Sequence, residues 1–204
     1  IENAEKVLMK SWKAYMSNLN SVTCDATCYE SNIKYPTDVK LLFDSVVWMH
    51  NQMVIYCKKF NLRKPRTKFK KWLKRSISYS KMKKKRKKKR RSVTRGLLRL
   101  LAKIIGLMDD LEQNHGMLSC HQQHLKRRDT IRIILEQQSH KFYDGVRPKN
   151  AIVSIDKPHL RPIVRGKEIK SVEFGSKVHK LQIDGISFIE HISFNAFNEG
   201  IRLQ

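Results

Sequence analysis

The sequence is poor in acidic residues and contains no long apolar run. Its 204 residues include 18 Asp and Glu against 43 Lys and Arg, which gives a formal net charge of +25. Self-repulsion on this scale is relieved mainly by a polyanion, and nucleic-acid phosphates are the commonest one. No apolar run approaches the roughly 18 to 20 residues that a membrane-spanning helix needs. Nucleic acid is therefore the first partner to consider, and an anionic membrane surface is the weaker alternative.

Cysteine is also scarce, with only Cys24, Cys28, Cys57 and Cys120. In a Lys-rich chain without a recognisable signal peptide, these predict reduced thiols in a cytosolic protein and no disulfide. A zinc site that combines Cys24 and Cys28 with Cys120, His121 and His124 is disfavoured, because structural zinc prefers closer Cys pairs on turns. Buried thiols and surface histidines are the favoured interpretation.

The first two thirds of the chain is predicted to be mostly helical. The short stretch 21–28 is the exception, because its β-branched residues and Cys suit a buried strand that contains Asp25. Thr37 is a good N-cap for the helix that follows, and Lys and Arg dominate residues 68–91, part of which has a disorder-like composition. Apolar spacing predicts helices over residues 3–18, 38–60 and, as two further helices, 92–140.

The last third is predicted to be rich in strands. Asp184-Gly185 is a strong hairpin-turn dipeptide, because Gly accepts positive φ. The stretch 158–166 is expected to be a basic loop. Strands are predicted over residues 151–155, 172–183 and 186–193.

Two blocks of sequence carry a resemblance to a known family. The first runs from Asp25 to Leu42 and contains Pro36-Thr37-Asp38 followed by Leu41-Leu42. The second contains Arg161-Pro162-Ile163-Val164-Arg165-Gly166-Lys167 and then Phe174-Gly175-Ser176-Lys177. In order and content the two blocks resemble the DDE transposases of bacterial insertion sequences, of the IS4-type superfamily. The resemblance spans nearly the whole chain.

The resemblance implies a fold, an activity and partners. It implies an RNase H-like α/β (α+β) core interrupted by a large basic helical insertion, with metal-dependent cleavage and strand transfer of transposon DNA. Three carboxylates hold two Mg²⁺ or Mn²⁺ ions in such enzymes, because hard cations prefer oxygen ligands. Asp25 maps onto the first of these catalytic, metal-binding acids. The implied partners are transposon-end and target DNA, and further copies of the chain in a transposition complex.

The other two acids of the family are expected beyond Gln204. Both ends of the sequence look cut, so we expect a truncated core and no DNA cleavage by these residues alone. Asp184, Glu190 and Glu173 are poor substitutes, because a turn Asp usually serves its backbone and strand acids usually face solvent. The alternative function is a catalytically inactive DNA- or RNA-binding remnant of a truncated or frameshifted transposase gene.

The candidate DNA-binding residues fall into two groups. Arg161, Arg165 and Lys167 are candidates for ordered phosphate contacts, because Arg forks suit bidentate binding; a solvated loop is the alternative. The second group is a basic run that is either a disordered, self-repelling segment or a phosphate-binding arm. It comprises Lys83, Lys84, Lys85, Arg86, Lys87, Lys88, Lys89, Arg90 and Arg91.

Three tryptophans complete the candidates. Trp12 and Trp48 are expected in the core, whereas Trp72 lies among Lys and Arg residues and weakly suggests a role in nucleic-acid binding. The expected organisation has three parts: residues 1–36 with the first strand, residues 37–145 as the Lys/Arg-rich helical insertion, and residues 146–204 as the β-rich part of the core. The expected location is the bacterial cytoplasm, in association with the nucleoid.

Overall fold

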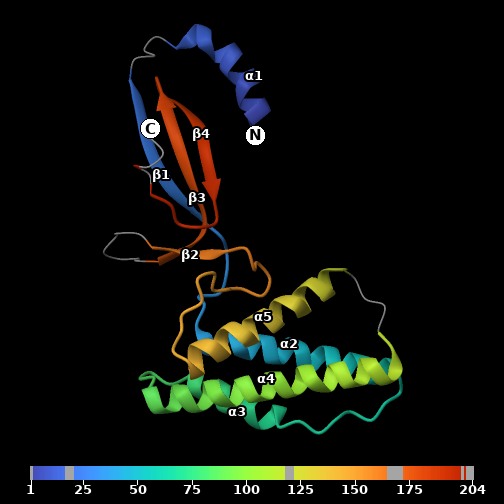
Figure 1. Ribbon diagram of the computed structural model, residues 1–204. Coiled ribbons are helices and arrows are strands. Elements are labelled where there is room, and N and C mark those ends of the chain that lie inside the picture. Colours follow the sequence, from blue (N-terminus) through green and yellow to red (C-terminus); the bar gives the residue numbers. More distant parts are fainter. Residues whose placement is uncertain (1, 17–20, 118–121, 165–171, 199, 201–204) are drawn as a thin grey trace. The chain divides into compact units, whose positions relative to one another are not determined.

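The computed structural model describes residues 2–16, 21–117, 122–164, 172–198 and 200. It confirms a chain of mixed helices and strands (Figure 1). The chain forms two compact units, one of Ile1–Ile33 with His159–Gln204 and one of Lys34–Pro158. In chain order the elements are α1 (Glu2–Trp12), a 3-10 turn (Lys13–Tyr15), β1 (Val22–Glu30), α2 (Asp38–Lys59), α3 (Phe69–Ser80), α4 (Lys87–His115), α5 (Gln122–Tyr143), β2 (Arg161–Val164), β3 (Val172–Ile183) and β4 (Ile186–Ser193).

The first unit is built on a four-stranded antiparallel sheet in which β3 is the central strand. β1 pairs along one edge of β3, and β2 and β4 share the opposite edge. The β3–β4 hairpin turns at Asp184 and Gly185, whose φ angles of 50° and 80° suit a two-residue primed turn. The hairpin predicted from the Asp-Gly dipeptide is therefore confirmed, with the predicted strand limits.

Gly175 lies where β1 and β2 both reach β3, opposite Glu30 and Arg161. A Cβ at this position would overlap the backbone carbonyl of Tyr29. A glycine inside a strand often marks such a close backbone approach. The Gly of the Phe174-Gly175-Ser176-Lys177 segment thus has a packing role in the sheet.

Two sequence predictions for the segment that follows α5 are wrong. Residues 151–155 form no strand, because Ile152 packs into the helical core instead. The Gln137 side chain fixes this segment: its Oε1 accepts from the Ile152 N–H at 3.0 Å, and its Nε2 donates to the Asn150 carbonyl at 3.1 Å. Part of the predicted basic loop 158–166 is the strand β2, which pairs with the first residues of β3.

The second unit packs α2, α4 and α5 around an apolar core, with α3 against α4. Thr37 caps α2 as predicted, because its hydroxyl accepts from the Lys40 N–H at 3.3 Å. The apolar row predicted on α4 is confirmed. Its buried members are Leu97, Leu98, Leu100, Leu101, Ile104, Ile105 and Met108.

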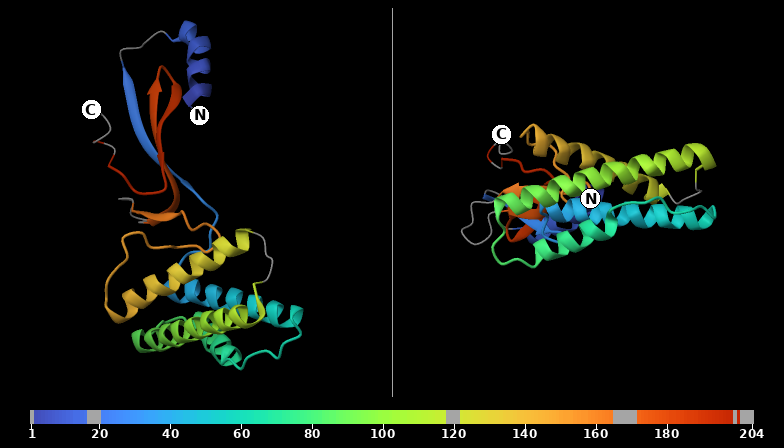
Figure 2. Two further views of the ribbon diagram at one scale, coloured as in Figure 1. Left: turned by 45° about the vertical axis from the view of Figure 1, so that its right-hand side comes forward. Right: turned by 90° about the horizontal axis from the view of Figure 1, so that it is seen from below.

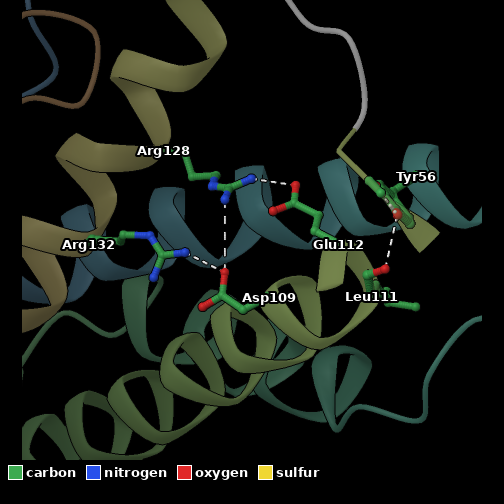
Figure 3. A network of polar contacts seen from close by, with 7 residues as sticks. Tyr56, Asp109, Leu111, Glu112, Arg128 and Arg132 are labelled. Carbon is green, nitrogen blue, oxygen red and sulfur yellow. Dashed lines mark hydrogen bonds and ion pairs between the residues drawn. The ribbon is translucent and has the colours of Figure 1, made fainter. Parts of the chain in front are cut away.

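The C-terminal end of α4 is tied to α5 by charged side chains (Figure 3). Arg128 donates to Glu112 at 2.5 Å, and Arg128 and Arg132 both approach Asp109. The hydrogen bond to Glu112 raises the pKa of Arg128. Nearby, the Tyr56 hydroxyl lies 3.1 Å from the Leu111 carbonyl oxygen. Acids near a helix C-terminus oppose the helix dipole, so these arginines compensate an unfavourable arrangement.

Trp72 of α3 packs closely against Gly96 of α4. A Cβ at position 96 would overlap the Trp72 ring, whereas a Cβ at Gly106 in the same helix meets nothing within 4 Å. We expect Gly96→Ala to lower the free energy of unfolding by about 1–2 kcal/mol, because overpacking outweighs the gain in helix propensity. The matched Gly106→Ala variant is expected to raise it by about 0.5–1 kcal/mol. Denaturant titrations measure both values, and equal stabilisation by the two variants would contradict this packing.

His50 is buried in the helical unit and stacks on Phe69, with ring centroids 3.7 Å apart. Its Nδ1 has no hydrogen-bond partner among the described residues. Burial, and then the nearby charge of Lys64, lower the pKa of His50. The folded chain therefore holds this imidazole neutral at a pH where the unfolded chain already protonates it.

This shift predicts a loss of stability in mild acid. The contribution of His50 is complete above the ordinary His pKa of about 6.5 and is lost as the pH falls from there through the lowered folded-state pKa. We expect the melting temperature of the wild type to fall more between about pH 7.5 and about pH 5 than that of His50→Gln, which lacks the titrating group. Thermal unfolding followed by circular dichroism measures the difference; parallel curves would refute it.

Candidate nucleic-acid interface

Asp25 lies inside β1, as predicted, but the strand is not buried. Its side chain is exposed, and Ala26 is the one buried residue of β1. The Thr27 hydroxyl donates to Asp25 Oδ2 at 3.0 Å, and Lys180 is the residue opposite on β3. The prediction of a buried strand is wrong because a strand is buried only where other elements cover the faces of its sheet, and the β1 side chains other than Ala26 are exposed or half-buried.

The surroundings of Asp25 do not fit a two-metal centre. No group of three His, Cys, Asp or Glu side chains in the described ranges is placed to hold a metal ion. The nearest charged position across the sheet is Lys180, whose ammonium lies 5.6 Å from the Tyr29 ring on the same face. A lysine beside the carboxylate does not add a metal ligand.

The substitute acids do not gather around Asp25 either. Asp184 occupies the hairpin turn. The expectation that strand acids face solvent is wrong for Glu173, which is buried, whereas Glu190 is exposed. Glu190 binds the Nδ1 of His179 at 2.8 Å, and His179 is itself 1% exposed. The burial of His179 could not be predicted, because the alternation of residues along a strand does not tell which face of the sheet is covered.

The predictions for thiols and tryptophans hold in part. Cys57 is buried, and burial raises the pKa of its thiol. Cys24 is exposed, which contradicts its predicted burial. Trp12 and Trp48 are partly buried; Trp12 lies 6.4 Å from Phe188. Among the remaining candidate zinc ligands, His124 is exposed, and Cys120 and His121 lie outside the described residues.

The Arg161 group is only partly described. Arg161 opens β2, is half-buried and donates to the Leu160 carbonyl at 2.8 Å. Arg165 and Lys167 lie outside the described residues. Lys177, from the second motif block, donates to the Phe197 carbonyl at 2.9 Å and lies 4.7 Å from the centre of the Phe197 ring. The Lys177 ammonium group therefore interacts with Phe197 of its own unit.

The second half of the basic run lies in a helix and not in an irregular segment. Residues 82–86 form the turn between α3 and α4, and Lys87 to Arg91 form the start of α4. The side chains of residues 83–91 are exposed, and no acid lies in the first turn of α4. Positive charge at a helix N-terminus opposes the dipole, so the run is electrostatically unfavourable in the isolated chain.

The basic run belongs to a longer cationic region. Between Asp44 and Asp109 the chain has no Asp or Glu, yet it carries more than half of the 43 Lys and Arg residues. On α4 the run is followed by Arg95, Arg99 and Lys103, which line one side of the helix facing α3. These three were missed in the sequence, although their spacing of four residues is the signal for one helix face.

No family model, curated protein or solved structure gives a significant match to this chain. None of the described helices is both long enough and apolar enough to span a membrane.

Proposed function

We propose that this chain is a DNA-binding part of a DDE-type transposase. The observation that carries the proposal is the cation-rich surface of α3 and the first half of α4, which lies within a stretch of sequence that has no Asp or Glu. Its Lys and Arg side chains lie on packed helices and on the turn that joins them, not on a separate tail. A polyanion would therefore bind to a surface of packed helices. Phosphates bound there release counterions and relieve the repulsion between these side chains.

The start of α4 adds an energetic argument. Its exposed Lys87 to Arg91 face the positive end of the helix dipole. The opposing end of the same helix carries acids that Arg128 and Arg132 compensate. A bound phosphate backbone would supply the same compensation at the cationic end.

The transposase part of the proposal rests on the resemblance of the two motif blocks. In that interpretation Asp25 is one metal-binding acid, on a strand that pairs antiparallel with the strand of a hairpin. Metal ions in the intact family supply the activation of the attacking oxygen and the stabilisation of the leaving one. The residues described around Asp25 do not fit that pair of ions, so no catalytic step is assigned to them.

A second candidate function is a non-catalytic DNA- or RNA-binding remnant. The exposure of Asp25 and the position of Lys180 opposite it favour this candidate. Both candidates share the cationic helices. They differ in whether Asp25 takes part in DNA cleavage.

DNA binding by the cationic helices, which both candidate functions include, predicts an affinity for DNA that depends steeply on salt concentration. We expect affinity for a short duplex DNA to fall at least about a hundredfold between about 50 mM and about 200 mM salt, because each neutralised phosphate contributes a slope of about 0.9 in log affinity against log salt. Fluorescence anisotropy with a labelled duplex measures the slope. Replacing Lys83, Lys84 and Lys85 by Gln in the irregular turn removes three exposed charges without touching a helix, and should reduce the slope. Affinity that barely changes with salt would refute DNA binding by this surface.

The transposase part of the proposal predicts that the 204-residue chain does not cleave DNA on its own. We expect no Mg²⁺- or Mn²⁺-dependent nicking of supercoiled plasmid, because one carboxylate does not hold the two ions that phosphodiester cleavage uses. The assay compares the wild type with Asp25→Ala and Asp184→Ala. Nicking by the wild type that Asp25→Ala alone abolishes would overturn this expectation and would decide against the remnant.

A further inference from the structure

A groove runs between α3 and α4 within the helical unit. The two helices lie side by side over the first half of α4 (Figures 1 and 2). One hollow of about 470 Å³ and another of about 480 Å³ lie along this junction, and both are lined by Arg75 and Ser92. Because they share these residues, the two hollows adjoin, and together they are here called the α3–α4 groove.

The lining of the α3–α4 groove is cationic. No Asp or Glu lines either hollow. Within the described ranges none of the lining cations forms an ion pair with a carboxylate. The α3 wall carries Lys68, Lys71, Lys74 and Arg75, and the α4 wall carries Lys89, Arg95, Arg99 and Lys103.

The length of the groove suits a run of phosphates. From Lys89 to Lys103 the α4 wall rises about 21 Å, at about 1.5 Å per residue. One strand of duplex DNA winds around the helix axis, so a straight wall of this length faces only a few consecutive phosphates of that strand. The row of cations on the two walls is therefore long enough for several phosphates of a backbone and is not confined to a site for one small anion.

The aromatic rings of the groove are already engaged. Trp72 lies against Gly96, with the Arg75 guanidinium 5.1 Å from its ring centre. Tyr79 is buried, and the Lys85 ammonium lies 5.9 Å from its ring centre. Proteins that bind single strands stack bases on open aromatic faces. The buried Tyr79 ring offers no such platform, and the Trp72 ring is half-buried against Gly96 and Arg75, which favours contacts to the backbone of a duplex.

We propose that the α3–α4 groove binds the sugar-phosphate backbone of one strand of duplex DNA. The inference rests on the proposed DNA-binding function and names its site: the walls of α3 and α4, with the exposed run 83–91 adding charge beside the groove. Backbone contacts of this kind set affinity and position without reading bases. Trp72 acts as a spacer that holds the two walls apart.

The test neutralises two cations of the α4 wall and compares a matched pair elsewhere. Arg95→Gln/Arg99→Gln removes two groove charges from one helix face. Lys58→Gln/Lys59→Gln removes two exposed charges from the last turn of α2, which lines neither hollow. Salt titrations with a short duplex are expected to show a slope smaller by about 2 for the groove pair, at about 0.9 per phosphate contact, and an unchanged slope for the α2 pair.

The outcomes separate the groove from the proposed function. A wild type without salt-dependent duplex binding refutes DNA binding itself. Salt-dependent binding that the groove pair and the α2 pair weaken equally refutes the groove alone, as does tighter binding of single-stranded DNA or of RNA than of duplex. Circular dichroism checks that each variant folds. If Arg95→Gln/Arg99→Gln does not fold, Lys68→Gln/Lys71→Gln on the opposite wall tests the same expectation.

Discussion

The separation of charge along α4 is the constraint on which the helical unit depends. The helix begins with cations and ends with Asp109, Asp110 and Glu112, so both ends oppose its dipole. At the acidic end, Arg128 and Arg132 of α5 supply the missing positive charge. Among the described residues no comparable ion pair forms at the basic end, where apolar packing of the buried α4 face holds the helix in place.

Features set by local chemistry follow directly from the sequence. Thr37 starts α2 through its own hydroxyl, and Asp184-Gly185 closes the hairpin because both residues adopt positive φ. The apolar row of α4 repeats with helical spacing and is buried as that spacing requires. In each case neighbours in sequence provide the determining interaction, so no knowledge of the tertiary structure is needed.

Features set by distant neighbours do not follow in this way. The residue types of the apolar stretch 151–155 predict a strand. The stretch instead binds the Gln137 side chain through the Ile152 N–H and packs Ile152 into the helical core. The residue types of β1 are typical of a buried strand, but Asp25 is exposed, because burial depends on whether distant elements cover the faces of the sheet. The α3–α4 groove could not be predicted from the sequence for a related reason, because its walls come from two different helices. The dense basic run 83–91 also makes the four-residue spacing of Arg95 and Arg99 hard to recognise.

The two parts of the functional hypothesis make different demands on structure. Screened attraction between many cations and a phosphate backbone tolerates small displacements, because it falls off over a Debye length of about 8–10 Å. Metal-assisted cleavage tolerates far less, because its ligands must lie within about 0.5 Å of the productive geometry. An acid-free surface on packed helices meets the first demand. A single exposed carboxylate, bonded to Thr27 and facing Lys180, does not meet the second. The proposed DNA binding therefore does not depend on the proposed DNA cleavage.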